Sequence, residues 1–571
     1  MAVALRRHPA LFAASAAIAG IEAALIVSLG PASAGPLAPQ VVAPAPYGVF
    51  HDLRWLLVYH SSWVVFVGLG LVALGVRSLL DVGLVRAAWP RERERPGLRA
   101  MLVHTLRFTA LQALILLPFA VLTFAMAVTS LSWLFFVAVP VLVMVAVLVH
   151  QGEVTDRWWR DRPASSTVKA SLGAFVVLSA TGALMTFVPR AIAPIIVPTI
   201  AAVGGVGLAW CRLQIVTSLA RRDEVVSARS RRRPFALVGL AAVLVLVVGG
   251  TGIGFAVAVA VESGRSPLPR VRPDAAGSPV LVVKGFNSKW EGITRRWVRG
   301  DHRIRRFSYR GLDADDAPRP YGRADTHQTL PELAREMRRQ VAAFRATTGE
   351  PVSIVAESEG ALVAQTYLAS TPRAPVRAVV LLSPLLAPGR VWYPLLGHDG
   401  WGVVAGTVLG GLAAAVGAVG PVDVSADTPL FRSMVDRGPT LGALLSCPPP
   451  GVRTYAVLPI DAGVAAPAPG TVDVAHEVVP AFHGGLLGDR TTARHVEQVL
   501  EGVSMPHGSS SWQTIGDGVA AIAAPWQAPD LEPAVLPVWR DLPVGPNCRA
   551  VRASLTRWVD GPEADLRTGS G

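Results

Sequence analysis

The chain has 571 residues, with 53 Lys+Arg against 40 Asp+Glu and a formal net charge of +13. This length allows several domains, and such a basic balance raises nucleic acid as a partner. The excess is uneven, however, because residues 1–264 hold 22 basic against 11 acidic residues, whereas residues 265–571 hold 31 against 29. In the first part the basic residues lie between long apolar runs, so membrane topology explains the charge better and no nucleic-acid partner is expected.

Seven apolar stretches in residues 1–262 are long enough to cross a bilayer, for which about 17–25 residues are needed. They lie near residues 11–29, 55–76, 107–128, 131–149, 169–188, 191–211 and 236–260. The first 262 residues are therefore predicted to form a helical transmembrane domain of about seven spans in the cell membrane.

Basic residues indicate how these spans are oriented. The N-terminus and the loops that would share its side, at 77–107, 150–169 and 212–233, contain 20 of the 22 basic residues, and the opposite loops hold only Arg54 and Arg190. The positive-inside rule then places the N-terminus in the cytoplasm and everything after Glu262 outside.

The first stretch also resembles a signal peptide, because Arg6-Arg7 and an apolar run precede Ala32-Ser33-Ala34. The apolar run is long for a signal peptide, which favours an uncleaved anchor. The later spans keep their orientation in both cases.

Two ionisable residues, Glu22 and His60, fall at membrane depth. Such residues are functional candidates by default. Two isolated residues do not make a relay, so a multi-span transporter or sensor with a silent outer domain is kept as the alternative hypothesis.

The second part of the chain has the pattern of an α/β domain. After a Pro- and Gly-rich linker at 263–278, apolar strand patterns alternate with helical patterns, which predicts a mostly parallel sheet covered by helices on both faces. Strands are expected at 279–288, 303–311, 352–356, 376–384, 454–460 and 472–480, and helices at 330–344, from 359, and at 491–500. Residues 385–450 interrupt this alternation, and residues 504–571 form a C-terminal extension.

The uncharged stretch Trp401 to Val422 is about long enough to cross a membrane. A crossing here would place the rest of the sheet on the wrong side of the bilayer. We therefore expect an apolar cap over the site, within residues 385–450, and keep an eighth span as the alternative.

A catalytic motif follows the strand at 352–356. Ala356-Glu357-Ser358-Glu359-Gly360 has the form small-x-Ser-x-Gly, in which a serine lies between a strand and the N-terminus of a helix. Backbone N–H groups and the helix dipole favour a developing negative charge at that place. The ordinary alternative is that Ser358 is only a helix N-cap.

With this motif, residues 279–503 resemble an α/β-hydrolase domain of the serine esterase and lipase type. An acid after a later strand and a histidine after the next follow the serine in the order that this fold requires. The resemblance implies Ser358 as nucleophile, Asp461 as orienting acid and His483 as general base, with the backbone N–H groups of Phe286 and Glu359 as the oxyanion hole.

Other residues compete for these roles. His476 precedes the last strand, His495 falls within a helix, and His507 lies further on, so position favours His483. Asp461 is favoured over the alternatives because it directly follows an apolar strand. The competing acids, which have the character of loop residues, are Asp423, Asp427 and Asp473.

Three charged residues depart from an ordinary hydrolase. Lys284 stands where such enzymes often carry histidine before Gly285, and Glu357 and Glu359 flank the serine. Two carboxylates near an oxyanion would oppose catalysis unless their side chains point away, and the sequence offers no reason for having both.

Three cysteines occur in the chain. Cys211 is placed at a membrane helix end, and Cys447 and Cys548 could pair in an oxidising compartment. Sequence separation does not show whether their side chains meet. No His/Cys cluster has metal-ligand spacing, so neither a metal nor another cofactor is expected.

Together these features predict a membrane-anchored, extracytoplasmic serine hydrolase. Its substrate would be an ester or thioester, with a lipid-like acyl group favoured by the apolar cap and the bilayer. Acyl transfer to an acceptor other than water passes through the same acyl-enzyme and stays open. The oligomeric state is not indicated.

Overall fold

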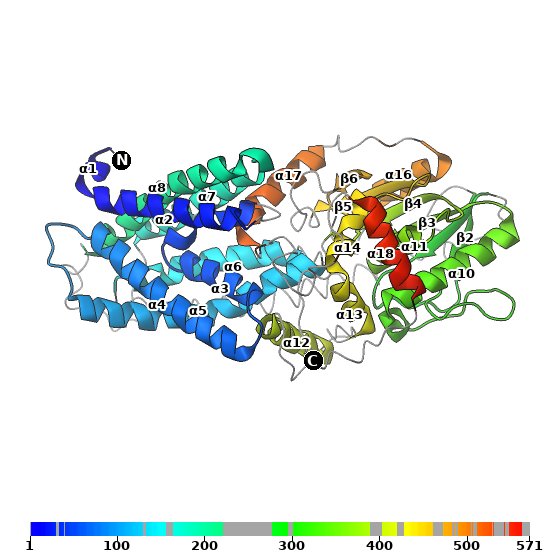
Figure 1. Cartoon of the computed structure of the whole chain (residues 1–571), viewed down its shortest axis with the longest axis horizontal. Helices are drawn as coiled ribbons and strands as arrows, with labels where there is room; N and C mark the ends of the chain where they lie inside the picture. Colours follow the sequence, from blue (N-terminus) through cyan, green and yellow to red (C-terminus); the bar gives the residue numbers. More distant parts are fainter. Residues whose placement is uncertain are drawn as a thin grey trace.

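The computed structural model describes residues 2–29, 34–38, 40–129, 133–155, 164–220, 277–294, 301–386, 388, 402–419, 428–460, 472–481, 483, 486, 489–503, 505, 511–527, 529, 542 and 547–561. The described residues up to 220 form a bundle of helices, and a sheet with its own helices lies beside one end of that bundle (Figure 1). The N-terminus lies at the other end of the bundle, away from the sheet (Figure 1).

The bundle consists of α-helices joined by short 3₁₀ turns. Its elements are α1 (Ala2–Arg7), α2 (Pro9–Val27), η1 (Gly35–Leu37), η2 (Gln40–Val42), α3 (Tyr47–Val58), α4 (Trp63–Ala88), α5 (Leu98–Thr129), α6 (Trp133–Val149), η3 (His150–Glu153), α7 (Ser165–Thr186), η4 (Arg190–Ile192) and α8 (Ala193–Ala220). Within the described residues, five segments are long and apolar enough to cross a membrane: Pro9–Val27, Trp63–Ala88, Leu98–Val121, Ser165–Thr186 and Arg190–Ala220. The 17-residue α6 is a shorter apolar helix.

The predicted span at 55–76 needs a correction. Two helices occupy this stretch in place of one: α3 ends at Val58, and α4 begins at Trp63. Ser62 starts the second helix by accepting the Val65 N–H on its hydroxyl at 3.2 Å. The long helix therefore begins later than the hydropathy pattern indicated, and the predicted span at 236–260 lies outside the described residues.

The sheet has six strands in the order β2-β1-β3-β4-β5-β6, and every neighbouring pair is parallel. The strands are β1 (Pro279–Val283), β2 (Arg303–Arg306), β3 (Val352–Glu357), β4 (Val376–Leu382), β5 (Arg453–Pro459) and β6 (Ala475–Val479). This confirms the predicted parallel sheet. The neighbouring strands β1 and β3 are buried along their whole length, as parallel strands covered on both faces must be.

Helices cover both faces of the sheet. One face packs on α10 (Leu330–Thr348), α11 (Glu359–Ser370) and α18 (Cys548–Asp560), while the other packs on α16 (Arg490–Glu501). α10 begins with a capping box in which Thr329 and Glu332 bond each other's backbone N–H groups. It ends at Gly349, whose φ of 74° suits a residue without a Cβ.

The interrupting segment 385–450 divides between the two regions. α12 (Val403–Val419) packs against α3, α4 and α5 of the bundle, and its first residues belong to the bundle's apolar core. By contrast, α13 (Pro429–Asp436), α14 (Gly438–Gly442) and η7 (Ala443–Ser446) contribute to the core of the sheet domain. Among the apolar side chains of α12 that the structure describes, only those of Val403 to Ala405 are fully buried against the bundle, and a cap over the site formed by 401–422 stays a prediction.

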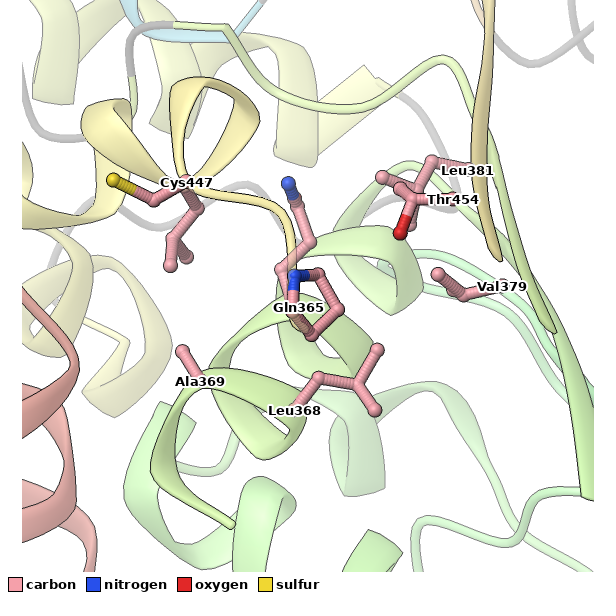
Figure 2. A pocket seen from close by; sticks show the side chains of 9 residues that line it. Gln365, Leu368, Ala369, Val379, Leu381, Cys447 and Thr454 are labelled. Atoms are coloured by element: carbon pink, nitrogen blue, oxygen red, sulfur yellow. The ribbon is translucent and has the colours of Figure 1, made fainter. Parts of the chain in front are cut away.

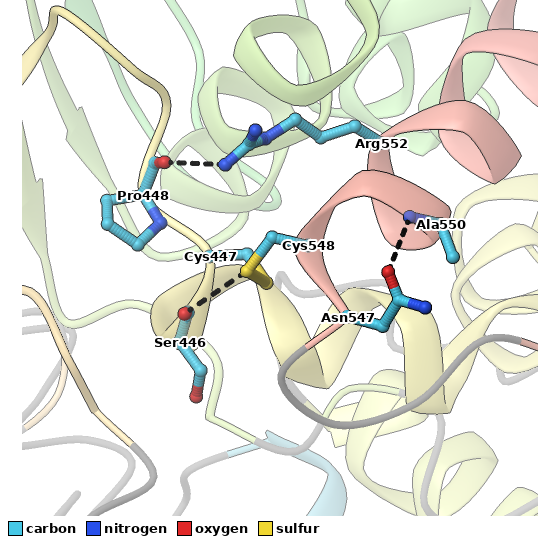
Figure 3. Close-up of a disulfide and its surroundings, with 7 residues drawn as sticks. All are labelled: Ser446, Cys447, Pro448, Asn547, Cys548, Ala550 and Arg552. Carbon is cyan, nitrogen blue, oxygen red and sulfur yellow. Dashed lines mark hydrogen bonds between the residues drawn. A yellow bond between two sulfur atoms is a disulfide. The ribbon is translucent and has the colours of Figure 1, made fainter.

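The C-terminal extension is also divided. α17 (Ser511–Ala523) and η9 (Ala524–Trp526) contact the bundle, whereas α18 is part of the sheet domain. A disulfide joins Cys548, the first residue of α18, to Cys447, with their Cα atoms 5.2 Å apart (Figure 3). The pairing that the sequence left open is therefore made, and it fastens α18 to the segment before β5.

Candidate active site

Ser358 stands between β3 and α11 in a conformation that few residues other than glycine adopt. Its φ is 57° and its ψ is −121°. Such backbone strain costs on the order of 1–3 kcal/mol and persists only where the surroundings enforce it. Here the Ser358 N–H donates to the Leu382 carbonyl at 2.8 Å, which ties the turn to the end of β4.

Two glycines allow the chain to approach this turn closely. A Cβ on Gly285 would lie 2.8 Å from the Ser358 Cβ, and a Cβ on Gly360 would lie 2.8 Å from the Lys284 carbonyl oxygen. Both distances are shorter than any normal contact. Gly360 is thus required because α11 packs closely on the end of β1. Gly285 is required because the Ser358 side chain occupies the space that a Cβ would need.

His483 lies against the serine. Its Nε2 is 2.8 Å from the Ser358 Oγ, across 125 residues of sequence. The competing histidines have other contacts: His476 Nδ1 bonds the Val474 carbonyl, and His495 Nδ1 bonds Glu477. The structure therefore brings together two of the three residues expected to form a triad, while Asp461 lies outside the described residues.

The turn after β1 is held by a neighbouring 3₁₀ segment, η6 (Arg323–His327). Asn287 adopts a φ of 57°, and its N–H donates to the Thr326 hydroxyl at 3.0 Å. The Phe286 ring stacks on His327 at 4.6 Å and meets the edge of Phe431 at 5.2 Å. These contacts fix the turn that begins at Gly285 beside Ser358, and they place aromatic side chains next to it.

Lys284 and Glu357, two of the departures from the expected pattern, are partners. The Lys284 Nζ donates to Glu357 Oε2 at 2.9 Å, and the Glu357 side chain is only 6% exposed. They lie at the ends of the neighbouring parallel strands β1 and β3, which brings their side chains together. The lysine therefore neutralises a carboxylate that would otherwise stand uncompensated beside the serine.

The Glu359 carboxyl lies in a different environment from that of Glu357. It is 2% exposed, and neither of its carboxyl oxygens has a hydrogen-bond partner within the described part of the chain. Burial raises the pKa of this carboxyl well above its usual value. Burial thus shifts Glu359 toward the neutral acid, which lessens the negative charge that it would place where an oxyanion would develop.

The environment of His483 keeps it in the form of a base. Burial lowers the pKa of the imidazole, and the nearby Glu357 carboxylate opposes this by raising it. The net direction is downward, so the neutral imidazole predominates at neutral pH and can accept a proton from the hydroxyl at 2.8 Å.

A second group of charged residues, which no local sequence pattern indicates, lies inside the bundle. Arg77 of α4 bonds both carboxylate oxygens of Asp52 of α3, at 2.6 and 2.7 Å. The Asp52 Oδ1 lies 3.1 Å from His51 Nδ1, and His51 Nε2 lies 3.6 Å from Glu22 of α2. Glu22 is therefore not isolated at membrane depth, as the sequence suggested, but ends a chain of four ionisable side chains.

A further buried ion-pair group surrounds Arg212 of α8. This arginine is fully buried and pairs with Asp81 of α4 at 3.0 Å and with Glu153 of η3. It also donates to the carbonyl oxygens of Val42 and Ala43, at 3.3 and 2.8 Å. The charge pattern places this arginine in a cytoplasmic loop, and the structure corrects that prediction, because Arg212 lies within α8 and holds the irregular segment after α2 in place.

His60 has a structural role in the contacts that the structure shows. Its Nδ1 bonds the Leu56 carbonyl at 2.9 Å, and its Nε2 accepts the Val404 N–H at 3.1 Å. The Gly402 N–H donates to the His60 carbonyl at 3.0 Å. His60 thus caps the N-terminus of α12 and fastens that helix to the bundle.

A small pocket lies elsewhere in the sheet domain (Figure 2). Its lining includes Leu368 and Ala369 near the C-terminal end of α11, together with Cys447 of the disulfide. Ser358 precedes the opposite end of that helix, so this pocket is separate from the serine.

Comparison of the chain with family models, with curated proteins and with solved structures found no match.

Proposed function

We propose that this protein is a membrane-anchored serine hydrolase that cleaves an ester or thioester. The observation that carries the proposal is the 2.8 Å contact between Ser358 Oγ and His483 Nε2, with the serine held in a strained turn at a helix N-terminus. A serine that served only as an N-cap would have no need of a histidine on its hydroxyl, and the Ser358 side chain makes no capping hydrogen bond. The resemblance to α/β-hydrolases is part of the same proposal.

The mechanism follows from the chemistry of the pair. His483 Nε2 takes the hydroxyl proton as Ser358 Oγ attacks the acyl carbon, and it returns that proton to the leaving alcohol or thiol. Water, or another acceptor, then attacks the acyl-enzyme with the same histidine as base. We assign the oxyanion to the N–H groups of Phe286 and Glu359, and the orientation of the imidazole to Asp461.

Three observations support an extracytoplasmic domain. The sheet lies at the end of the bundle away from the N-terminus (Figure 1). The disulfide favours an oxidising compartment. The contacts between the bundle and later segments are made by residues such as His60 and Gly182, near the helix ends that the positive-inside rule places outside. A further crossing within 221–276 would bring the chain to that side.

A membrane-derived acyl substrate fits this arrangement. The end of β4 accepts the Ser358 N–H, and the next described helix along the chain, α12, packs on the bundle. Phe286 and Phe431 offer apolar contacts beside the oxyanion turn. We therefore favour a lipid ester over a small polar one.

The test is covalent labelling of the full-length chain in lipid nanodiscs with a fluorophosphonate. Wild type should be labelled, Ser358→Ala should not, and Ser353→Ala, which removes a buried hydroxyl from the strand before the serine, should be labelled like wild type. Equal labelling of wild type and Ser358→Ala would refute the nucleophile. Hydrolysis of long-chain esters in vesicles, compared with short soluble esters, then tests the lipid preference.

A second candidate function is favoured by the charged groups inside the bundle. A transporter or sensor would need ionisable side chains that face one another at membrane depth, and Glu22, His51, Asp52 and Arg77 do so. Proton flux into vesicles that contain the full chain tests this function. A flux that Glu22→Gln abolishes and Ser358→Ala preserves would favour it over the hydrolase.

A further inference from the structure

The segment Ser511–Gln527 joins the two regions of the molecule. It consists of α17 and η9 with the residue that follows, and α17 packs on β6 of the sheet as well as on α7 of the bundle. The contact with the sheet is close, because a Cβ on Gly516 would lie 3.2 Å from a methyl of Val478. Figure 1 shows α17 extending between the bundle and β6. We call residues 511–527 the strap.

The strap ends in a socket within the bundle. Trp526 is 1% exposed, and its ring stacks on Phe175 at 4.9 Å and meets Tyr47 edge-on at 5.7 Å. The indole N–H donates to the Ser179 hydroxyl at 3.0 Å. Both the apolar ring and its one polar atom are therefore matched by the bundle.

Side chains of the bundle also bind the backbone on both sides of Trp526. Gln40 donates its amide N–H to the Pro525 carbonyl at 2.5 Å, and Arg54 donates to the Gln527 carbonyl while holding the Gln40 side chain at 3.1 Å. Gly182 lies so close that a Cβ there would be 2.6 Å from the Pro525 ring. Shape and hydrogen bonds thus specify this segment, which distinguishes the socket from an incidental apolar contact.

The other end of the strap supports the strand that leads to the site. β6 is an edge strand that pairs only with β5 within the described sheet. His483 follows shortly after Val479, the last residue of β6. Movement of β6 would therefore be passed directly to the imidazole, and a displacement of about 1 Å in a catalytic group can cost about 100-fold in rate.

We propose that Trp526 is a positioning residue, through which the bundle, by way of α17 and β6, holds His483 against Ser358. This inference rests on the hydrolase proposal for its effect on activity. It gives the multi-span region a task beyond anchoring, since a single span would attach the domain to the membrane but would provide no socket.

The experiment measures the rate of fluorophosphonate labelling of Ser358 in the full chain in nanodiscs, for wild type, Trp526→Ala, Trp526→Phe and Trp512→Ala. We expect Trp526→Ala to be labelled at least about 10-fold more slowly. Trp526→Phe keeps the stacked ring and should recover most of the rate. Trp512→Ala is the matched control, because Trp512 lies on the same strap but is 40% exposed, and it should label like wild type.

Two further readouts separate positioning from general destabilisation. Hydrogen exchange in Trp526→Ala should rise in residues 475–483 and stay unchanged in β1 and β3. The acid limb of the labelling rate should move toward higher pH, because burial lowers the pKa of His483 and a loosened strand would expose it. Should Trp526→Ala fail to fold, Ser179→Ala, which removes one hydrogen bond of the socket, and Gln40→Ala, which removes two, take its place in the same measurements.

The outcomes are distinct for the two proposals. If the wild-type chain is not labelled, the proposal that the protein is a serine hydrolase is refuted. Hydrogen exchange in residues 475–483 is then the one measurement that decides whether the bundle holds β6 in place. The positioning role is overturned if Trp526→Ala is labelled at the wild-type rate. It is also overturned if the substitution raises hydrogen exchange in residues 524–527 but leaves exchange in residues 475–483 unchanged.

Discussion

The bundle and the sheet domain bury charged side chains in different ways. In the bundle, Arg77 and Arg212 neutralise carboxylates on other helices and bind carbonyl oxygens of an irregular segment, so their charges hold the fold together. In the sheet domain, Lys284, Glu357 and Glu359 gather with a histidine where the strands end, around a strained serine. Charge therefore supports structure in the first region, whereas in the second it surrounds the serine and histidine that we propose to be catalytic.

The largest effect on stability is expected for Arg212→Met. The substitution leaves Asp81 and Glu153 buried without their cation, and breaking a buried pair in this way typically costs about 3–5 kcal/mol. Thermal unfolding of the full chain in detergent measures it. A loss below about 1 kcal/mol would show that the bundle does not depend on this group.

The disulfide should contribute a similar or slightly smaller amount in the sheet domain. Replacing Cys447 and Cys548 by alanine opens a link across 101 residues, and loss of a native disulfide typically costs about 2–5 kcal/mol. The midpoint of denaturant unfolding of the sheet domain should fall. Cys211→Ala serves as the control because Cys211 forms no disulfide, and it should leave that transition unchanged.

Glu357→Gln tests whether charge in the sheet domain acts on the histidine that we propose to be catalytic. The Glu357 carboxylate raises the pKa of His483, so its removal should lower that pKa and move the acid limb of the labelling rate to lower pH, by about one unit or less. Glu350→Gln, which removes a half-exposed partner of Arg303, is the matched control. If both variants keep the acid limb of the wild type, the Glu357 carboxylate does not affect the pKa of His483.

The smallest effect is expected at the surface. Lys289 and Glu291 pair at 3.0 Å with side chains 63% and 77% exposed, and such pairs contribute about 0–1 kcal/mol. Lys289→Ala should therefore change the free energy of unfolding by no more than that range, as measured by denaturant unfolding. A larger loss would mean that exposure is a poor guide to which charges matter in this protein.

Much of the sheet domain follows from local patterns. The strands alternate with helices at regular spacing, which predicts a parallel sheet. Residues that follow the carboxyl ends of parallel strands lie at the same edge of the sheet. Ser358 and His483 can therefore be paired from their positions in the sequence. The elbow motif is local too, since Gly360 is required by packing beside the turn itself. The compensation of Glu357 by Lys284 is harder to predict, because it depends on β1 and β3 being neighbours.

The bundle shows why the remainder could not be predicted. Hydropathy marks where a helix is apolar but not where it ends or which face meets which neighbour, so it places Arg77 and Arg212 in loops although both lie within helices. Asp52 and Arg77 are 25 residues apart, and Asp81 and Arg212 are 131 apart, with no local signal to connect them. His60, in the break between α3 and α4, finds its partner in α12, 344 residues later.

By itself the sequence determined the division into an apolar and a globular region, the parallel sheet and the candidate serine and histidine, because periodicity and short motifs are set by neighbouring residues. Only the tertiary structure decided that α12 packs on the bundle, that Lys284 neutralises Glu357, and that Trp526 enters a socket formed by α3 and α7. Those contacts join distant segments, and they exist only once the chain has folded and the surfaces that match each other have met.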